Sequence, residues 1–224
     1  DPAPAPTGSS PGYFSIVGDT TLFFASTPQT GLELWRTDGT PEATTLVKDL
    51  FPGPQSSFFP GSPFDTRYAV VNGRLFFVAD DGRRGVDLWS SGGTEGGTGR
   101  IATFVEGPLS LVGLDGALLF TASAPDPTSG FCIWKSDGTP PGTQVMKCGP
   151  GSMTKPTVMG GALYFLSGTS LWRSDGSEAG TEVIVQSVQT FFVAGGSLFL
   201  LSFPGPQLSI SDGTAPGTRP LKVF

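Results

Sequence analysis

The chain has 224 residues and a formal net charge of −6; charged residues make up only 14% of it, while 33 residues are Gly and 21 are Pro. The negative charge argues against nucleic-acid binding, because phosphates require a basic face, and no run of about 18 apolar residues is present to insert into a membrane. The sequence has no His, the commonest general base and metal ligand, so we expect a protein that is not an enzyme.

Residues 1–12 form a Pro/Ala-rich stretch that begins with DPAPAP. Such a stretch favours extended polyproline geometry and cannot build a core. It resembles the tether that remains when a secretion or lipoprotein signal is removed, although an artificial start point would look the same. We therefore expect a tether over 1–12, a single folded domain over 13–224, and a secreted, cell-surface or periplasmic location.

The folded domain contains five imperfect copies of one motif, whose first copy reads LWRTDGT. The copies occupy 34–40, 88–94, 133–139, 171–177 and 208–214. Repeats of this size indicate an architecture in which each unit buries its apolar face against the next unit.

The second copy shows how the strands of one repeat follow each other. A strand at 69–71 is followed by Asn72-Gly73, a dipeptide typical of tight hairpins, and then by a strand at 75–78. The motif itself supplies a third strand, and a β-rich run such as 45–49 in the first copy supplies the fourth. Leu75, Phe76 and Phe77 make the second strand apolar on both faces, so both faces must be covered.

These features predict an all-β fold, a five-bladed β-propeller of four-stranded antiparallel blades. We expect the first strand of each blade to lie near the axis. The last blade should meet the first to close the ring, either with wholly sequential blades or with one blade shared by both termini.

The motif resembles the bacterial ELWxSDGTxxGT repeat family, also described as hyalin-like repeats. The residues that carry the resemblance are 33–40, continued by 46–54, and the hairpin with its acidic loop at 71–82. The resemblance implies a secreted or surface propeller, for the most part without an assigned activity. Copy two has Gly92 in place of the Asp and copy five has Ser209 in place of the Trp, which is expected of a scaffold rather than of a five-fold identical site.

The Asp of each Asp-Gly-Thr turn can hold the turn by accepting hydrogen bonds from backbone N–H groups further along the chain. These residues are Asp38, Asp137, Asp175 and Asp212. Calcium is an alternative ligand, but each turn offers a single carboxylate and lacks the spacing of a calcium loop. Direct contact with another ligand is the third interpretation. We expect structural turns, no metal and no cofactor.

Aromatic residues are the candidates for ligand contact. Trp35, Trp89, Trp134 and Trp172 either stack on sugar rings or pack between blades. Phe58 and Phe59 lie in a Pro-rich loop that either caps the groove between the first two blades or exposes a contact surface. The loops at 80–85 and 124–130 are also distinctive.

The two cysteines are predicted to form a disulfide. If the hairpin of the third copy folds back about Pro140, then Cys132 and Cys148 face each other, because each is eight residues from it. Directly opposed residues of antiparallel strands fall within disulfide range. A disulfide would favour an oxidising compartment.

We therefore expect a monomeric, exported recognition or scaffold module that binds a surface glycan or an envelope protein, with no nucleic acid and no membrane insertion. The alternatives are a glycan-active hydrolase that uses acids in the axial funnel and a purely structural surface repeat protein.

Overall fold

The computed structural model describes residues 9–58, 66–83, 85–205 and 207–224, so most of the expected tether lies outside the described residues. The fold of the described residues is all-β, as predicted, with five sheets of four antiparallel strands in sequence order. These residues form no helix that could cross a membrane.

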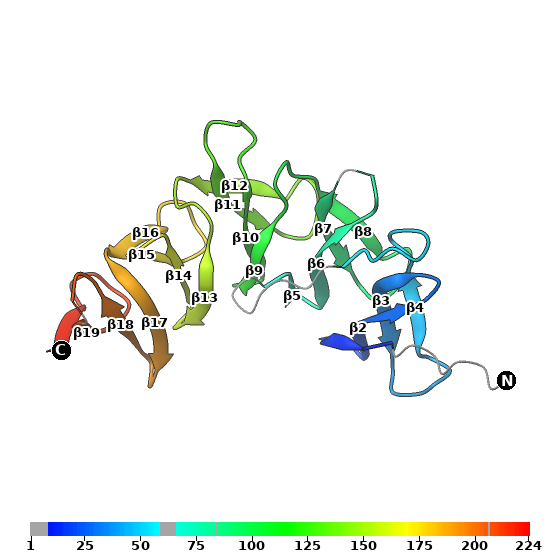
Figure 1. The fold of residues 1–224 in the computed structure, drawn as a ribbon, viewed down its shortest axis with the longest axis horizontal. Coiled ribbons are helices and arrows are strands. Elements are labelled where there is room, and N and C mark those ends of the chain that lie inside the picture. The colour runs from blue at the N-terminus through cyan, green and yellow to red at the C-terminus, as the bar shows by residue number, and fades with distance from the viewer. Residues whose placement is uncertain (1–8, 59–65, 84, 206) are drawn as a thin grey trace.

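The strands of the first three sheets have the following bounds: β1 (Gly12–Val17), β2 (Thr20–Thr27), β3 (Gly31–Thr37) and β4 (Thr45–Lys48); β5 (Tyr68–Val71), β6 (Arg74–Asp80), β7 (Val86–Ser91) and β8 (Thr98–Ala102); β9 (Leu109–Leu114), β10 (Ala117–Ser123), β11 (Phe131–Ser136) and β12 (Gln144–Cys148). The fourth and fifth sheets contain β13 (Thr154–Met159), β14 (Ala162–Ser167), β15 (Ser170–Ser174) and β16 (Glu182–Val185); and β17 (Val188–Ala194), β18 (Ser197–Ser202), β19 (Gln207–Ser211) and β20 (Arg219–Val223). We call these sheets blades one to five, because they follow one another like the blades of a propeller (Figure 1).

The turn between the first two strands of a blade has the predicted geometry. Asn72 and Gly73 have φ values of 47° and 67°, and Asp115 and Gly116 have values of 46° and 74°. Positive φ at both central residues is the signature of the tight turn that matches strand twist. The dipeptides therefore identified the hairpins correctly.

The blades form an arc that is open on one side (Figure 1). The first strands β5, β9, β13 and β17 lie along its concave side, where we expected the axis. Blades one and five lie at opposite ends of the arc. The contact between the last and first blades that a five-bladed ring requires is therefore not present in Figure 1.

Four apolar clusters hold the arc together, one at each junction between successive blades. We call the face of a blade that touches the next blade its following face, and the face that touches the previous blade its leading face. The following faces contribute Leu22, Phe76, Leu119 and Tyr164, and the leading faces contribute Phe77, Phe120, Phe165 and Leu200. Because neighbouring residues of the second strand point to opposite faces, a strand that is apolar throughout serves two junctions at once.

The predicted disulfide is confirmed. Cys132 pairs directly with Cys148 across β11 and β12, and the bridge joins Cα atoms 4.0 Å apart. The pairs nearer the turn, such as Lys135 with Gln144, are one position out of the expected register. A bulge between Ile133 and Trp134 restores it.

In blades one and two, an acidic residue stands at the position equivalent to Cys132: Glu33 and Asp87, respectively. Glu33 is fully buried and accepts hydrogen bonds from the N–H groups of Leu50 and Ser57, both 3.1 Å, and from the Ser57 hydroxyl at 2.6 Å. Asp87, also buried, accepts a bond from Arg100 at 3.2 Å. The acids, like the disulfide, thus fasten the segment that leaves the blade to its third strand.

Candidate functional site

The tryptophans of blades two, three and four lie at the junctions. Trp89 is 7% exposed and belongs to the cluster between blades one and two, and its Nε1 donates to the Ala79 carbonyl at 3.2 Å. Trp134 and Trp172 pack against the clusters that join their blades to the preceding ones. They also stack on Phe120 and Phe165 of their own blades, with ring centroids 6.3 and 6.2 Å apart. The sequence allowed these tryptophans either to stack on sugar rings or to pack between blades, and in the structure they pack between blades.

Trp35 differs from the other three because no blade precedes blade one among the residues that the structure describes. It lies beside Phe23 on the leading face and is half-buried. The tryptophans therefore do not line a set of equivalent open pockets between blades.

The aspartates of the motif bind their own turns. In each of four turns the Asp Oδ1 atom accepts the N–H and the hydroxyl of the Thr or Ser two residues later, at 2.7–2.9 Å. These bonds, above all the hydroxyl bond, hold the pKa of the carboxyl below its usual value in Asp38, Asp137, Asp175 and Asp212. The described residues contain no group of three metal-ligating side chains.

Phe58 is buried, with 1% of its surface exposed, and stacks on Phe24 with ring centroids 3.8 Å apart. It therefore caps the groove between blades one and two and does not form the exposed contact surface that the sequence also allowed. Phe59 lies outside the described residues.

A cavity of about 360 Å³, lined by both charged and apolar side chains, opens between blades one and two. It is lined by Lys48, Asp49, Leu50, Pro52, Asp81, Arg83, Trp89 and Arg100. Lys48 is the last residue of β4, and Arg100 lies in the middle of β8. The loop at 80–85, which the sequence singled out, contributes Asp81 and Arg83. We call this the junction cavity.

Ion pairs fix part of the junction cavity. Arg100 lies 3.5 Å from Asp81 and 3.2 Å from the buried Asp87. Burial raises the pKa of Asp87, and the bond and charge of Arg100 oppose that effect. The guanidinium is thereby held at the cavity edge by two carboxylates.

Asp49 is the part of the cavity wall that lacks a partner. Its Oδ1 atom is buried and accepts no hydrogen bond from any residue that the structure describes. A buried acceptor without a partner is costly, so this carboxylate leaves an unmet hydrogen-bonding requirement in a residue of the cavity lining. Sequence reasoning did not single out Lys48, Asp49 or Arg100, because only the packing of two blades brings them beside the 80–85 loop.

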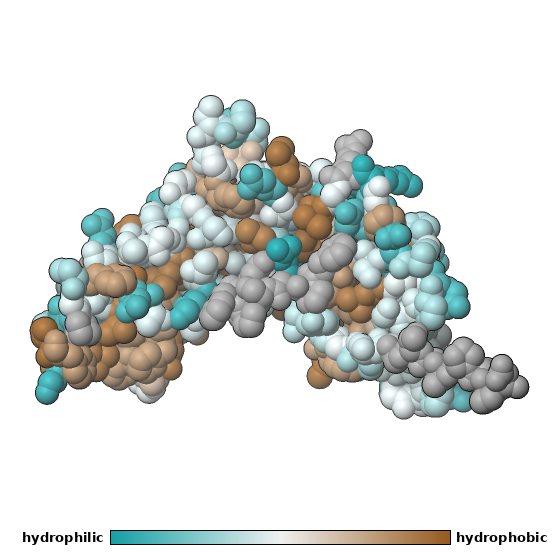
Figure 2. All heavy atoms as spheres, viewed as in Figure 1, coloured by the Kyte–Doolittle hydropathy of each residue, from teal (hydrophilic) through white to brown (hydrophobic). Residues whose placement is uncertain are grey.

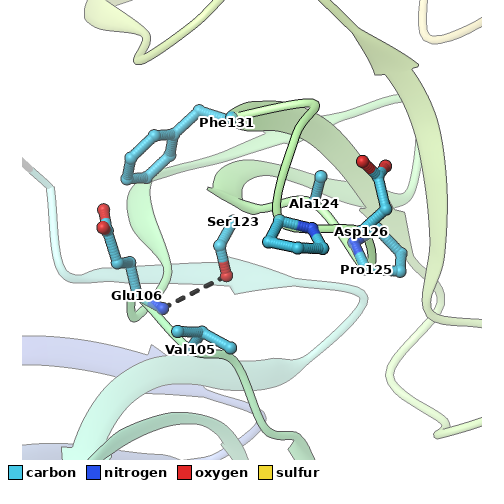
Figure 3. A pocket seen from close by; sticks show the side chains of 9 residues that line it. Val105, Glu106, Ser123, Ala124, Pro125, Asp126 and Phe131 are labelled. Carbon is cyan, nitrogen blue, oxygen red and sulfur yellow. Dashed lines mark hydrogen bonds between the residues drawn. The ribbon is translucent and has the colours of Figure 1, made fainter.

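A second cavity, of about 440 Å³, lies beside blade three (Figure 3). It is bounded by the other distinctive loop, at 124–130, and is lined mainly by apolar groups, including Val105, Pro125 and Phe131. Ser123 accepts a hydrogen bond from the Glu106 N–H at 3.1 Å across its floor. The hydroxyls of Ser129 and Thr128, and to a smaller extent their N–H groups, lower the pKa of Asp126 to about 2.

No family model and no curated protein matches the sequence. Among solved structures, the chain is similar to the computationally designed Ika8 protein, with a TM-score of 0.51 and 10% identity over 96% of this chain. It is also similar to the tricorn protease, with a TM-score of 0.50 and 15% identity over 97% of this chain. The chain spans 61% of the first structure and 23% of the second, so its five blades correspond to part of each. At these identities the likeness concerns the fold alone.

Proposed function

We propose that the protein is a non-catalytic recognition module built from propeller-type blades, and that the junction cavity binds a glycan of the cell surface. The observation that carries the proposal is a cavity whose lining brings carboxylates and cationic side chains together, including Asp49, one oxygen of which has no partner among the described residues. A sugar ring offers several hydroxyls, each able to donate and accept, which suits a wall of carboxylate acceptors and Lys or Arg donors.

The arrangement of the charges supports binding of a neutral or weakly charged sugar. Lys48, Arg83 and Arg100 face Asp49 and Asp81 around the cavity, so neither sign dominates its lining. The pairing of Arg100 with Asp81 and Asp87 keeps its guanidinium in place before a ligand arrives, which reduces the entropy lost on binding. The same fixed donors and acceptors would make the site selective for hydroxyl geometry.

The proposal is tested by a glycan array followed by titration of the strongest glycan. Asp49→Ala and Arg83→Ala should each lower the affinity about ten- to a hundredfold, because a hydrogen bond to a charged group is worth about 1.5–3 kcal/mol. Glu42→Ala, at an exposed residue of the first Asp-Gly-Thr turn, is the matched control and should leave affinity unchanged. An array without any hit, or equal binding by all variants, would contradict the proposal.

The non-catalytic part of the proposal has its own readout. Incubation of array-positive glycans with the protein should release no new reducing ends. If the wild type releases new reducing ends and the Asp49→Ala variant does not, the result would favour the hydrolase alternative.

A protein partner is the second candidate function, and the cavity beside blade three favours it. Val105 is 94% exposed and lies with Pro125 and Phe131 at that cavity, which gives an apolar patch with Asp126 at its edge. Val105→Glu should abolish capture of an envelope protein there and leave glycan binding unchanged.

A further inference from the structure

The four junctions repeat the same contacts, and these contacts define what a blade requires of its neighbour. The motif glycine of each later blade sits against the following face of the previous one: a Cβ atom on Gly93 would lie 3.5 Å from Leu22, and one on Gly138 would lie 3.0 Å from Phe76. A turn glycine is needed here because its φ is positive and the space is filled.

A lysine of the fourth strand adds a polar contact at two junctions. Lys48 donates to the Thr98 carbonyl of blade two at 3.2 Å, and Lys147 donates to the Thr181 carbonyl of blade four at 2.6 Å. In both cases the lysine pairs with the apolar residue that precedes the Trp, and the acceptor is the last Thr of the motif turn. Lys222 has the same place in blade five, opposite Leu208.

The following face of blade five has these features but no neighbouring blade within the described part of the chain. Leu208 is half-buried there, whereas its equivalents in the other blades are fully buried: Leu34, Leu88, Ile133 and Leu171. Phe192 is 57% exposed and stacks on Phe199 with ring centroids 5.1 Å apart. Figure 2 shows apolar atoms gathered over this end of the molecule.

Blade five is also more apolar on this face than the blades that are covered. Phe192 stands where the earlier blades have Ser15, Ala69, Val112 and Thr157. Ile210 stands where they have Arg36, Ser90, Lys135 and Arg173. A terminal repeat that ends a stack in water needs a polar outer face, so blade five is not built as a cap.

The leading face of blade one is the complementary surface. Phe14 is 59% exposed and stacks on Phe23 with ring centroids 5.4 Å apart. Gly39, the motif glycine of this blade, has no atom within 4 Å of its Cβ position, unlike its equivalents at the four junctions. The Thr44 carbonyl is the counterpart of the acceptors used by Lys48 and Lys147.

We propose that a second copy of this chain covers these faces head to tail, with the following face of blade five on the leading face of blade one of the other copy. The contact continues an interface that the chain already makes four times, and Lys222 donates to Thr44 of the other copy. The two faces of one chain cannot meet each other, because they lie at opposite ends of the arc (Figure 1).

Two arcs joined at both ends form a closed ring with two-fold symmetry, in which each contact is heterologous. This differs from the monomer expected from the sequence, because the uncovered faces become evident only when the blades are arranged in space.

Light scattering coupled to size exclusion tests the proposal with the full chain. The wild type should have twice its chain mass of 23.2 kDa. Phe14→Glu and Phe192→Glu each place a charge on one of the two faces and should each give monomers, with circular dichroism spectra like that of the wild type. Val158→Glu, at a 45% exposed residue of β13, is the matched control and should leave the pair intact.

Mixing the two variants distinguishes a head-to-tail contact from a symmetric one. Phe14→Glu keeps an intact blade-five face and Phe192→Glu keeps an intact blade-one face, so an equimolar mixture should pair through one interface. A wild type that stays monomeric up to about 100 μM, or a pair that survives either substitution, would overturn the proposal. So would failure of the mixture to associate when both variants are folded.

Discussion

Removal of the disulfide should destabilise the protein by an amount that follows from the loop it closes. Cys132 and Cys148 are separated by 16 residues in sequence. In the chain-entropy model, a loop of this size restricts the unfolded chain enough to contribute about 3 kcal/mol to the free energy of unfolding. The double substitution Cys132→Ala/Cys148→Ala should therefore lower the melting temperature by about 6–12 °C for a domain of this length.

The assay is urea unfolding followed by fluorescence, with and without a reductant. The wild type should lose its extra stability in reductant, whereas the double variant should be unaffected by it. A loss below about 1 kcal/mol would refute the reasoning, because it would mean that the bulged β11–β12 pairing holds the two segments together without the bridge. Equal sensitivity of both proteins to reductant would also count against it.

The other predictions concern titration and packing. Because hydrogen bonds lower the folded-state pKa of the four motif aspartates, their contribution should be present above pH 3.8 and lost as the pH falls below it; replacement of all four by Asn should flatten acid unfolding monitored by circular dichroism. Burial raises the pKa of Glu33 from 4.5 to about 7. The stabilisation linked to this shift should therefore be present below pH 4.5 and lost as the pH rises through 7, so that the melting temperature falls over this range. Glu33→Gln should remove that fall in melting temperature. Leu163→Ala, at a fully buried residue in the cluster between blades three and four, should cost about 2–5 kcal/mol in urea unfolding, while Val158→Ala at an exposed site should cost little.

Local features were predictable because they depend on residues close in sequence. The turn dipeptides fixed the hairpins, and the apolar second strands, such as 75–78, indicated sheets covered on both faces. The disulfide was predicted because the two cysteines are equally far from Pro140 in sequence, although the bulge beside Trp134 was not foreseen. These are the parts of the fold in which each residue's environment is set by its own blade.

The curvature of the arc and the junction cavity could not be predicted in the same way. The angle between blades depends on how side chains such as Phe77 and Trp89 fill each junction, and small differences in volume accumulate along the chain. The cavity requires Lys48 and Arg100, which are 52 positions apart, to meet the loop at 80–85. The role of the four motif tryptophans was ambiguous from the sequence, because an indole suits a sugar site and a packed junction equally well.

Hydrogen exchange measured by mass spectrometry, with and without the strongest glycan from the array, tests the central claim most directly. If the junction cavity is the binding site, backbone amides in 48–52, 81–83 and 98–102 should gain protection, and those in 124–130 should not change. Protection confined to 124–130, or absent from all these segments while the glycan is bound, would contradict the account.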